Sequence, residues 1–183
     1  YVRSAAVNSL GLLRVSASTG TVVAALANDP SGQVRQSAAV ALAYLNDPGA
    51  APALVAALRD SEPGVRFAAA RSLGALRSKE GGPALLAALK DADPGMRRTA
   101  AASLGQIGDP SAAEALIAAM KDDDAFVRQE AARGLGQIGD ARAKDVLKGA
   151  LSDTAKGVVL NAATALSRLG DSSGLKAAGA MRK

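Results

Sequence analysis

One dipeptide, Val-Arg or a close variant of it, recurs along this chain at a nearly constant interval. The first step between successive dipeptides is 32 residues, and every later step is 31 residues. Self-similarity with a period of about 20–50 residues is typical of repeat architectures, in which each repeat is one supersecondary element stacked on the next. The interval therefore predicts an array of about six repeats. The dipeptides are Val2-Arg3, Val34-Arg35, Val65-Arg66, Met96-Arg97, Val127-Arg128 and Val158-Val159.

Each repeat is predicted to consist of two helices joined by a tight turn. In the repeat that begins at Val127, Ala131, Leu135 and Ile138 follow at the spacing of one apolar helix face. Gly139 then suits the left-handed conformation that ends many helices. The Asp that follows it suits the N-cap of a second helix. No segment alternates apolar and polar residues as a strand would, so we predict an all-α fold.

The residue that ends the first helix differs between repeats. Arg14 and Arg77 hold this position in two of them. Because arginine disfavours the left-handed conformation, we expect the helix ends at these two residues to have a different geometry. The other repeats have Asn46, Gly108, Gly139 and Gly170.

A second glycine recurs inside the first helix, at the tenth position of several repeats. Glycine within a helix costs about 1 kcal/mol relative to alanine. We therefore expect another helix to pack closely against this position. The glycines are Gly11, Gly74, Gly105 and Gly136.

The composition excludes several kinds of active site. The sequence contains no Cys and no His, so disulfides, the usual zinc sites and Ser-His-Asp or Cys-His nucleophile systems are not available. Aromatic residues make up 2% of the chain, so the core must consist of Ala, Leu, Val and Ile. No apolar run approaches the roughly 18–20 residues of a membrane span. We predict no catalytic residue, no metal site, no cofactor and no membrane span.

The formal net charge of +5 comes from the end of the sequence. Residues 1–140 contain equal numbers of basic and acidic side chains, whereas residues 141–183 contain eight Lys or Arg and three Asp. This asymmetry indicates an acidic partner, or weak and salt-sensitive binding of nucleic acid by the basic segment. The last repeat also reads Val158-Val159-Leu160, where other repeats place polar residues at the second and third of these positions. Such a run indicates either contact with another chain or domain, or weak packing at a frayed end.

Two segments show the repeat pattern most completely, Asp91–Asp109 and Asp122–Asp140. They follow D-x-x-P-x-V-R-x-x-A-A-x-x-L-G-x-[LI]-G-D closely, and on this motif the chain resembles HEAT-type repeats, specifically the short HEAT-like repeats named after phycobilisome lyases. The resemblance implies one domain over residues 1–183, folded as a right-handed α-solenoid whose second helices line the concave face. Its repeats would be residues 2–33, 34–64, 65–95, 96–126, 127–157 and 158–183.

An aspartate precedes the arginine of the dipeptide by six residues in three successive repeats. The aspartate is expected at the end of one second helix and the arginine at the start of the next first helix. Bonds between them would form a structural ladder that links the repeats, and HEAT-like families use these positions structurally. Ligand binding is the alternative. The ladder residues are Asp60, Arg66, Asp91, Arg97, Asp122 and Arg128.

Two rows on the second helices are candidates for a partner-binding face. One row is cationic and consists of Arg59, Lys90 and Lys121. It lies on the last turn of the second helices, where the helix dipole also favours cations. The other row is apolar and consists of Val23, Val55, Leu86 and Ile117, and Lys148 takes the same position in the next repeat. This row either packs between repeats or forms the floor of a groove. The side chains beside both rows are mostly small. The candidate partner-binding residues are Val23, Val55, Arg59, Leu86, Lys90, Glu114, Ile117, Lys121, Asp145 and Lys148.

These observations favour a non-enzymatic adaptor or scaffold that binds another protein or peptide, an acidic one in particular, along the second-helix face. The resemblance also implies an enzymatic alternative, a bilin lyase or isomerase subunit that delivers a tetrapyrrole to a Cys of a phycobiliprotein. Nucleic-acid binding is a further alternative, because some HEAT-like solenoids are DNA-repair glycosylases. The groove of those proteins uses aromatic and acidic residues that are not found here. The aromatic residues available to stack on a bilin are Tyr1, Tyr44, Phe67 and Phe126.

The chain opens with Tyr1 inside a repeat, so we expect that an upstream segment, such as a signal peptide, was removed or left out. The cytoplasm is favoured as the compartment, and a secreted or periplasmic location is the alternative if a signal peptide preceded Tyr1. The identity of the partner and the oligomeric state stay open at this point.

Overall fold

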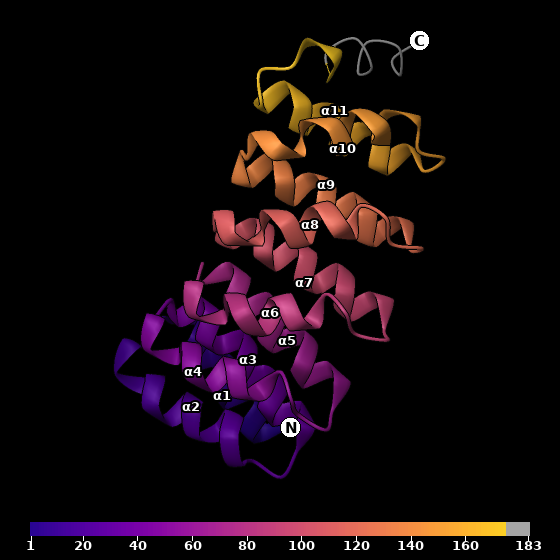
Figure 1. Ribbon diagram of the computed structural model, residues 1–183. Coiled ribbons are helices and arrows are strands. Elements are labelled where there is room, and N and C mark those ends of the chain that lie inside the picture. Colours follow the sequence, from indigo (N-terminus) through magenta and orange to yellow (C-terminus); the bar gives the residue numbers. More distant parts are fainter. Residues whose placement is uncertain (175–183) are drawn as a thin grey trace. The chain divides into compact units, whose positions relative to one another are not determined.

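The computed structural model describes residues 1–174. Every regular element within them is an α-helix or a 3₁₀ turn, which confirms the predicted all-α repeats (Figure 1). The first helices of the repeats, called A helices, are α1 (Val2–Leu12), α3 (Gly32–Leu45), α5 (Pro63–Ala75), α7 (Pro94–Ile107), α9 (Ala125–Ile138) and α11 (Lys156–Arg168). The second, called B helices, are α2 (Thr19–Asn28), α4 (Ala51–Ala57), α6 (Gly82–Ala88), α8 (Ala113–Ala119) and α10 (Lys144–Gly149).

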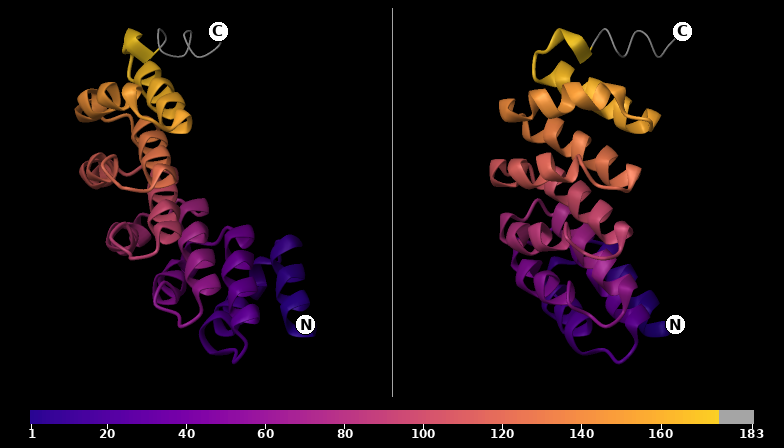
Figure 2. Two further views of the ribbon diagram at one scale, coloured as in Figure 1. Left: turned by 90° about the vertical axis from the view of Figure 1, so that its right-hand side faces the viewer. Right: turned by 45° about the vertical axis from the view of Figure 1, so that its right-hand side comes forward.

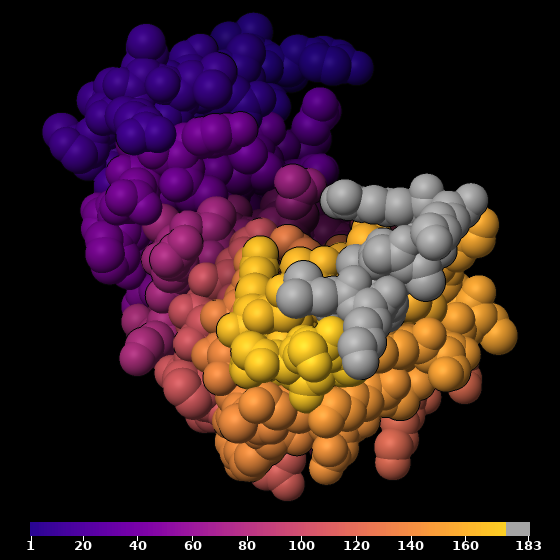
Figure 3. Space-filling view, turned by 90° about the horizontal axis from the view of Figure 1, so that it is seen from above, coloured from indigo at the N-terminus to yellow at the C-terminus, as the bar shows by residue number. Residues whose placement is uncertain are grey.

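The chain divides into two compact units, an N-terminal unit, Tyr1–Ala84, and a C-terminal unit that starts at Leu85. In the N-terminal unit α3 packs between α1 and α5, and α2 and α4 each pack against the A helix that follows. In the C-terminal unit α9 packs between α7 and α11, and α8 and α10 pack in the same way. Figure 2 (left) shows the C-terminal unit as a column of A helices beside the B helices, and Figure 3 views its α11 end. The single domain over residues 1–183 stays a prediction.

Leucine pairs form the core of the repeats. One leucine of each A helix and one of the following B helix are at most 1% exposed in four successive repeats. Full burial of a leucine side chain contributes about 1.5–3 kcal/mol, so these pairs replace the aromatic residues that the composition lacks. The leucines are Leu42 and Leu54, Leu104 and Leu116, Leu135 and Leu147, and, at the division between the units, Leu73 of the N-terminal unit and Leu85 of the C-terminal unit.

The recurring glycine inside the A helix lies where neighbouring A helices approach closely. A Cβ atom on Gly136 would lie 2.7 Å from Ala165 Cβ, and one on Gly11 would lie 2.7 Å from Ala41 Cα. A side chain here would push the helices apart, since packed interiors accommodate extra atoms poorly. The expected close packing is confirmed at both positions.

Aspartate begins the B helices through a short 3₁₀ turn. The side chain of Asp47 accepts a hydrogen bond from Gly49 N, and that of Asp109 accepts one from Ser111 N, both at 2.9 Å. The predicted aspartate caps are therefore present. Each cap starts a 3₁₀ turn, Pro48–Ala50 or Pro110–Ala112, which then continues as α4 or α8.

All the A helices that are followed by a B helix are closed by one residue in the left-handed conformation. The helix ends at Arg14 and Arg77 nevertheless differ from the others, as expected. Asn46, Gly108 and Gly139 are themselves the C-caps, whereas α1 and α5 have right-handed C-caps, Leu13 and Leu76, and the left-handed arginine follows them. The φ angles are 71° at Gly108 and 76° at Gly139, and they are 51° at Arg14 and 49° at Arg77. A residue with a Cβ atom pays about 1–2 kcal/mol for this conformation. The reason is tertiary: each B helix must pack against the next A helix, and this packing dictates the direction in which the chain leaves the first helix.

Replacing Arg77 by Gly is expected to raise the free energy of unfolding by about 1 kcal/mol, because glycine adopts the positive φ without a Cβ clash. Urea unfolding followed by circular dichroism measures the change. Arg71→Gly is the matched control, since Arg71 is exposed within α5 and glycine there should lower the free energy of unfolding by about 1 kcal/mol. Destabilisation by Arg77→Gly would contradict the prediction.

Candidate functional site

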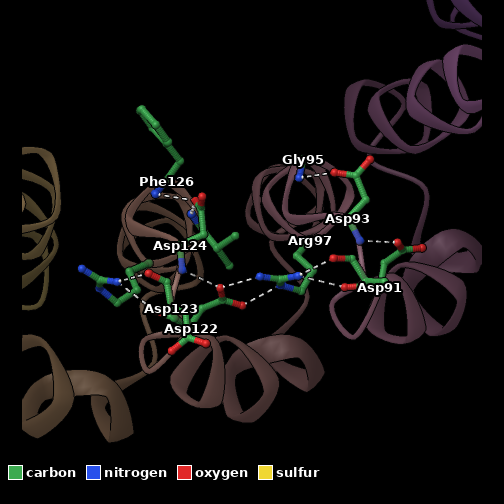
Figure 4. Close-up of polar contacts among 11 residues, drawn as sticks. Asp91, Asp93, Gly95, Arg97, Asp122, Asp123, Asp124 and Phe126 are labelled. Carbon is green, nitrogen blue, oxygen red and sulfur yellow. Dashed lines mark hydrogen bonds and ion pairs between the residues drawn. The ribbon is translucent and has the colours of Figure 1, made fainter.

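The arginine near the start of an A helix binds two successive turns of the chain (Figure 4). Arg97 donates from Nε and Nη2 to the carboxylate oxygens of Asp122, at 2.7 and 2.8 Å. Its Nη1 donates to the main-chain oxygens of Asp91 and Ala92, at 3.0 and 3.1 Å. Arg97 thus connects the turn that precedes α7 to the turn that follows α8.

For Arg35, Arg97 and Arg128 the carboxylate partner lies 25 residues later in the sequence, not six residues earlier. Arg35 binds the carboxylate of Asp60 at 2.7 and 2.8 Å, and Arg128 binds that of Asp153 at 2.8 and 3.0 Å. At the predicted spacing of six residues the contact is to a main-chain oxygen, as in the 2.8 Å bond from Arg66 Nη1 to Asp60. The spacing of 25 residues is itself repeated in the sequence and is the signal that would have identified these pairs.

The arginines hold the pKa of their aspartate partners below the ordinary value. Hydrogen bonds from Arg97 lower the pKa of Asp122, and hydrogen bonds from Arg35 lower that of Asp60. Asp122 Oδ1 also accepts from Asp124 N at 2.9 Å, and Asp124 in turn caps α9. The ladder carboxylates are therefore occupied by the fold, and little capacity remains on them for a ligand.

The outer side of the B helices in the N-terminal unit presents small side chains next to half-buried valines. Val23 on α2 and Val55 on α4 are half-buried, while Ala24 and Ala56 beside them are exposed. The helices α2 and α4 contact each other. Arg59 is exposed and lies just after α4, where its amide donates to Ala56 O at 3.1 Å. These residues form what we call the B-helix face of the N-terminal unit.

The C-terminal unit repeats this arrangement on α6 and α8. Leu86 and Ile117 are half-buried, and Glu114 is exposed in the first turn of α8. Lys90 and Lys121 are exposed just after the helices, in turns closed by amide bonds of 3.0 and 3.1 Å to the carbonyls three residues earlier. Together these residues form the B-helix face of the C-terminal unit. In residues 1–174, neither these two lysines nor Arg59 forms an ion pair with an acidic side chain.

The last described repeat departs from this pattern. Lys148 Nζ lies 2.9 Å from Asp171 Oδ2, and this contact raises the pKa of Lys148 and helps to lower that of Asp171. Arg142 is paired with Asp140 at 2.6 Å, whereas Asp145 is exposed on α10. Part of the predicted basic excess is thus neutralised within the fold. Three of the other six cations of residues 141–183, Lys176, Arg182 and Lys183, lie outside the described residues.

The described part of the chain offers no cluster of acidic side chains that could hold a metal ion. All buried side-chain nitrogen and oxygen atoms within it have a hydrogen-bond partner. Its helices are too short or too polar to cross a membrane. The exposed residues of the B-helix face are therefore the candidates for contact with a partner in the described part of the chain.

Replacing Asp122 by Asn is expected to lower the free energy of unfolding at neutral pH by about 1–2 kcal/mol, because the bidentate charged pair with Arg97 is lost. The pKa of Asp122 is lowered from 3.8 in the fold. The pair therefore stabilises the protein above about pH 4, and this stabilisation is lost as the pH falls toward the folded pKa. Urea unfolding of both proteins should show a difference that shrinks below about pH 4. Asp123→Asn, in the exposed neighbour, is the control and should change little; an equal loss in both variants would contradict the ladder role.

Several solved structures are similar to this chain, while no curated protein matches its sequence. The complex of CpcE and CpcF of phycocyanin lyase from Nostoc is 26% identical with a TM-score of 0.68, and the match covers 96% of this chain and 74% of that chain. Human deoxyhypusine hydroxylase is 19% identical with a TM-score of 0.58, covering 92% and 79% of the two chains. A designed armadillo repeat protein in complex with the peptide (KR)4 is 20% identical with a TM-score of 0.65, covering 81% and 80%. The similarity to the hydroxylase and to the armadillo repeat protein concerns the fold alone.

The pattern of a protein family accounts for most of the sequence. HEAT repeats match residues 19–91 and 82–168, which include every helix described here except α1. This match agrees with the tandem A and B helices and with their stacking within each unit. It also agrees with the arginine that connects successive turns. The chain belongs to the HEAT repeats family.

Proposed function

We propose that the protein is a non-enzymatic adaptor or scaffold that binds a segment of another protein along the B-helix face of either unit. The observation that carries the proposal is the character of that face. Exposed alanines such as Ala56 and Ala118 adjoin half-buried Val55 and Ile117, and the cations beyond the helices have no acidic partner in the described residues. Small side chains let the backbone of a partner approach closely, and the apolar row offers it some burial.

The charge of the face favours an acidic partner. Arg59, Lys90 and Lys121 are exposed and lie at helix C-termini, where the helix dipole stabilises their positive charge. An acidic segment would gain attraction from these cations without breaking an existing ion pair. By contrast, Lys148 would have to give up Asp171, so the last repeat should contribute less to binding. Such attraction mainly increases the association rate and the specificity, and it weakens as salt is added.

The similarity to the complex of CpcE and CpcF supports a protein partner. In that structure a chain 26% identical to this one is part of a complex of two different proteins. A protein partner is also consistent with the lack of His and Cys and, in the described residues, of acidic groups that could hold a metal ion.

Reversing the three cations with Arg59→Glu, Lys90→Glu and Lys121→Glu should weaken partner binding by about tenfold or more at low salt. Peptides selected from a display library on the immobilised wild-type protein serve as ligands, and their affinities are measured by titration at two salt concentrations. Acidic residues should be enriched among the selected peptides.

The matched control carries Arg71→Glu, Arg98→Glu and Lys156→Glu, which change the net charge equally but lie on A helices. The control should keep most of the wild-type affinity. Equal losses in both variants would show that only net charge matters, and unchanged binding in the first variant would reject the proposed face.

A subunit of a bilin lyase or isomerase is the second candidate, and the likeness to phycocyanin lyase favours it. The aromatic residues offer little support, because Tyr1, Tyr44 and Phe126 are exposed and only Phe67 is half-buried. Adding the open-chain tetrapyrrole biliverdin to the protein should leave its visible absorption spectrum unchanged if the adaptor proposal is right. A saturable spectral shift, lost after Phe126→Ala or Tyr44→Ala, would support the lyase candidate instead.

A further inference from the structure

The outer side of the A helices in the N-terminal unit exposes large apolar side chains. Val40 and Tyr44 are one helical turn apart on α3 and are 37% and 47% exposed. Their exposure does not arise from an end of the unit, because α3 packs between α1 and α5. The chain has only two Tyr and two Phe, so an aromatic side chain that lies half outside the core does not serve the packing of the repeats.

Arg14 and Arg77 lie beside these apolar side chains, at the corners where an A helix is connected to its B helix. Gly11 of α1 approaches Ala41 of α3 so closely that a Cβ atom on the glycine would lie 2.7 Å from Ala41 Cα. Arg14 and Tyr44 follow three residues later on their two helices, and they therefore adjoin. Arg77 takes the same position after α5, which also packs against α3. Both arginines are exposed.

The corners of the N-terminal unit differ in charge from those of the C-terminal unit. Each corner consists of two residues, and in the C-terminal unit these are Gly-Asp after both α7 and α9. Two of the three corners in the N-terminal unit instead begin with arginine and lack the aspartate. Val15, which replaces the aspartate of the first corner, is 39% exposed. The corners are Arg14-Val15, Asn46-Asp47, Arg77-Ser78, Gly108-Asp109 and Gly139-Asp140.

Arginine is an unfavourable residue at these corners. The φ angles of 51° at Arg14 and 49° at Arg77 cost a residue with a Cβ atom about 1–2 kcal/mol, whereas glycine adopts them without this penalty. The packing of the B helices accounts for the left-handed conformation but not for the choice of arginine, and strained residues cluster at functional surfaces. Within residues 1–174 neither arginine side chain has a hydrogen-bond or ion-pair partner. The acidic residues of the following turns, Asp47 and Glu80, are not paired with them.

We propose that the corners of the N-terminal unit form a second docking site, which binds an acidic segment of another protein around an apolar residue of that segment. The site consists of Arg14, Val15, Val40, Tyr44 and Arg77, and we call it the corner site. It shares no residue with the B-helix face, so it is independent of the proposed adaptor function.

The spacing of the helices defines the partner further. Packed helices lie about 8–10 Å apart, and the two arginines are two helices apart. They would therefore bind acidic groups roughly 16–20 Å apart, with the apolar residue between them against Tyr44. A membrane surface fits this site less well. Two cations contribute only about 1 kcal/mol each at an anionic bilayer, and Val40 and Tyr44 are at most 47% exposed.

The test selects random linear peptides from a display library on a full chain whose B-helix cations are already reversed. This background carries Arg59→Glu, Lys90→Glu and Lys121→Glu, so peptides that depend on those cations are not recovered. The selected peptides should carry acidic residues on both sides of an aromatic or aliphatic residue.

Titration then compares the background with a variant in which the corner site is replaced. Tyr44→Gln, Arg14→Gly and Arg77→Gly introduce the residues that the C-terminal unit has at these positions. They should weaken peptide binding by about tenfold or more at low salt. The melting temperature should stay equal or rise, because glycine relieves the positive φ. Tyr44→Gln alone, at an exposed position, should weaken binding several-fold and leave the melting temperature unchanged.

The control carries Lys156→Ala and Arg168→Gln in the same background, which remove the same number of positive charges from α11. It should keep most of the affinity, and an equal loss in both variants would overturn the proposal. Equal binding by the replaced corner site and its background also overturns it, as does a selection that recovers no peptide or only peptides without acidic residues. Binding to vesicles that contain phosphatidylserine, lost when the corner site is replaced, would assign the site to a membrane surface instead.

Discussion

The guanidinium group near the start of an A helix holds three successive elements of the repeat in register. Arg97 binds the carbonyl of the turn before its own helix and the carboxylate of the turn after the next B helix. The bonds to the carboxylate are bidentate and the side chain is 18% exposed, so this contact is stronger than an ordinary surface ion pair. Because Asp122 is bound by Arg97 through its carboxylate and by Arg128 through its carbonyl, the arginines form a continuous chain of contacts within the C-terminal unit.

This arrangement separates the residues that build the fold from those available for binding. The ladder aspartates, the aspartate caps and the leucine pairs are all occupied by contacts inside the repeats. The outer side of the B helices has a different composition, with alanines such as Ala56 and Ala118 exposed and cations such as Lys121 unpaired in the described residues. A binding surface can therefore change on these helices without loss of the contacts that hold the repeats together.

Local sequence patterns predicted the elements better than their connections. The apolar spacing around Leu135 and the aspartate at Asp47 were sufficient to predict a helix and a helix start, because both depend on neighbouring residues. The different cap at Arg77 was predicted, but the left-handed conformation of the arginine was not, since the packing of the next B helix overrides the preference of arginine. For the ladder, the right residue types were recognised but the carboxylate partner was sought six residues away. The bond from Arg97 to Asp122 crosses a complete A–B pair, and only the folded repeat brings these two residues together.

The residues of the B-helix face also show which features the sequence could predict and which it could not. Its residues were found by their common register, but the sequence could not distinguish Lys148, which is paired with Asp171, from Lys121, which is not. By itself, the sequence determined the 31-residue period, the two helices of each repeat and the absence of His and Cys chemistry, because these follow from composition and local periodicity. Only the tertiary structure decided which cations are unpaired, which carboxylate each arginine binds and which helix face stays uncovered. These properties depend on distances between residues of different elements, and such distances are set by packing.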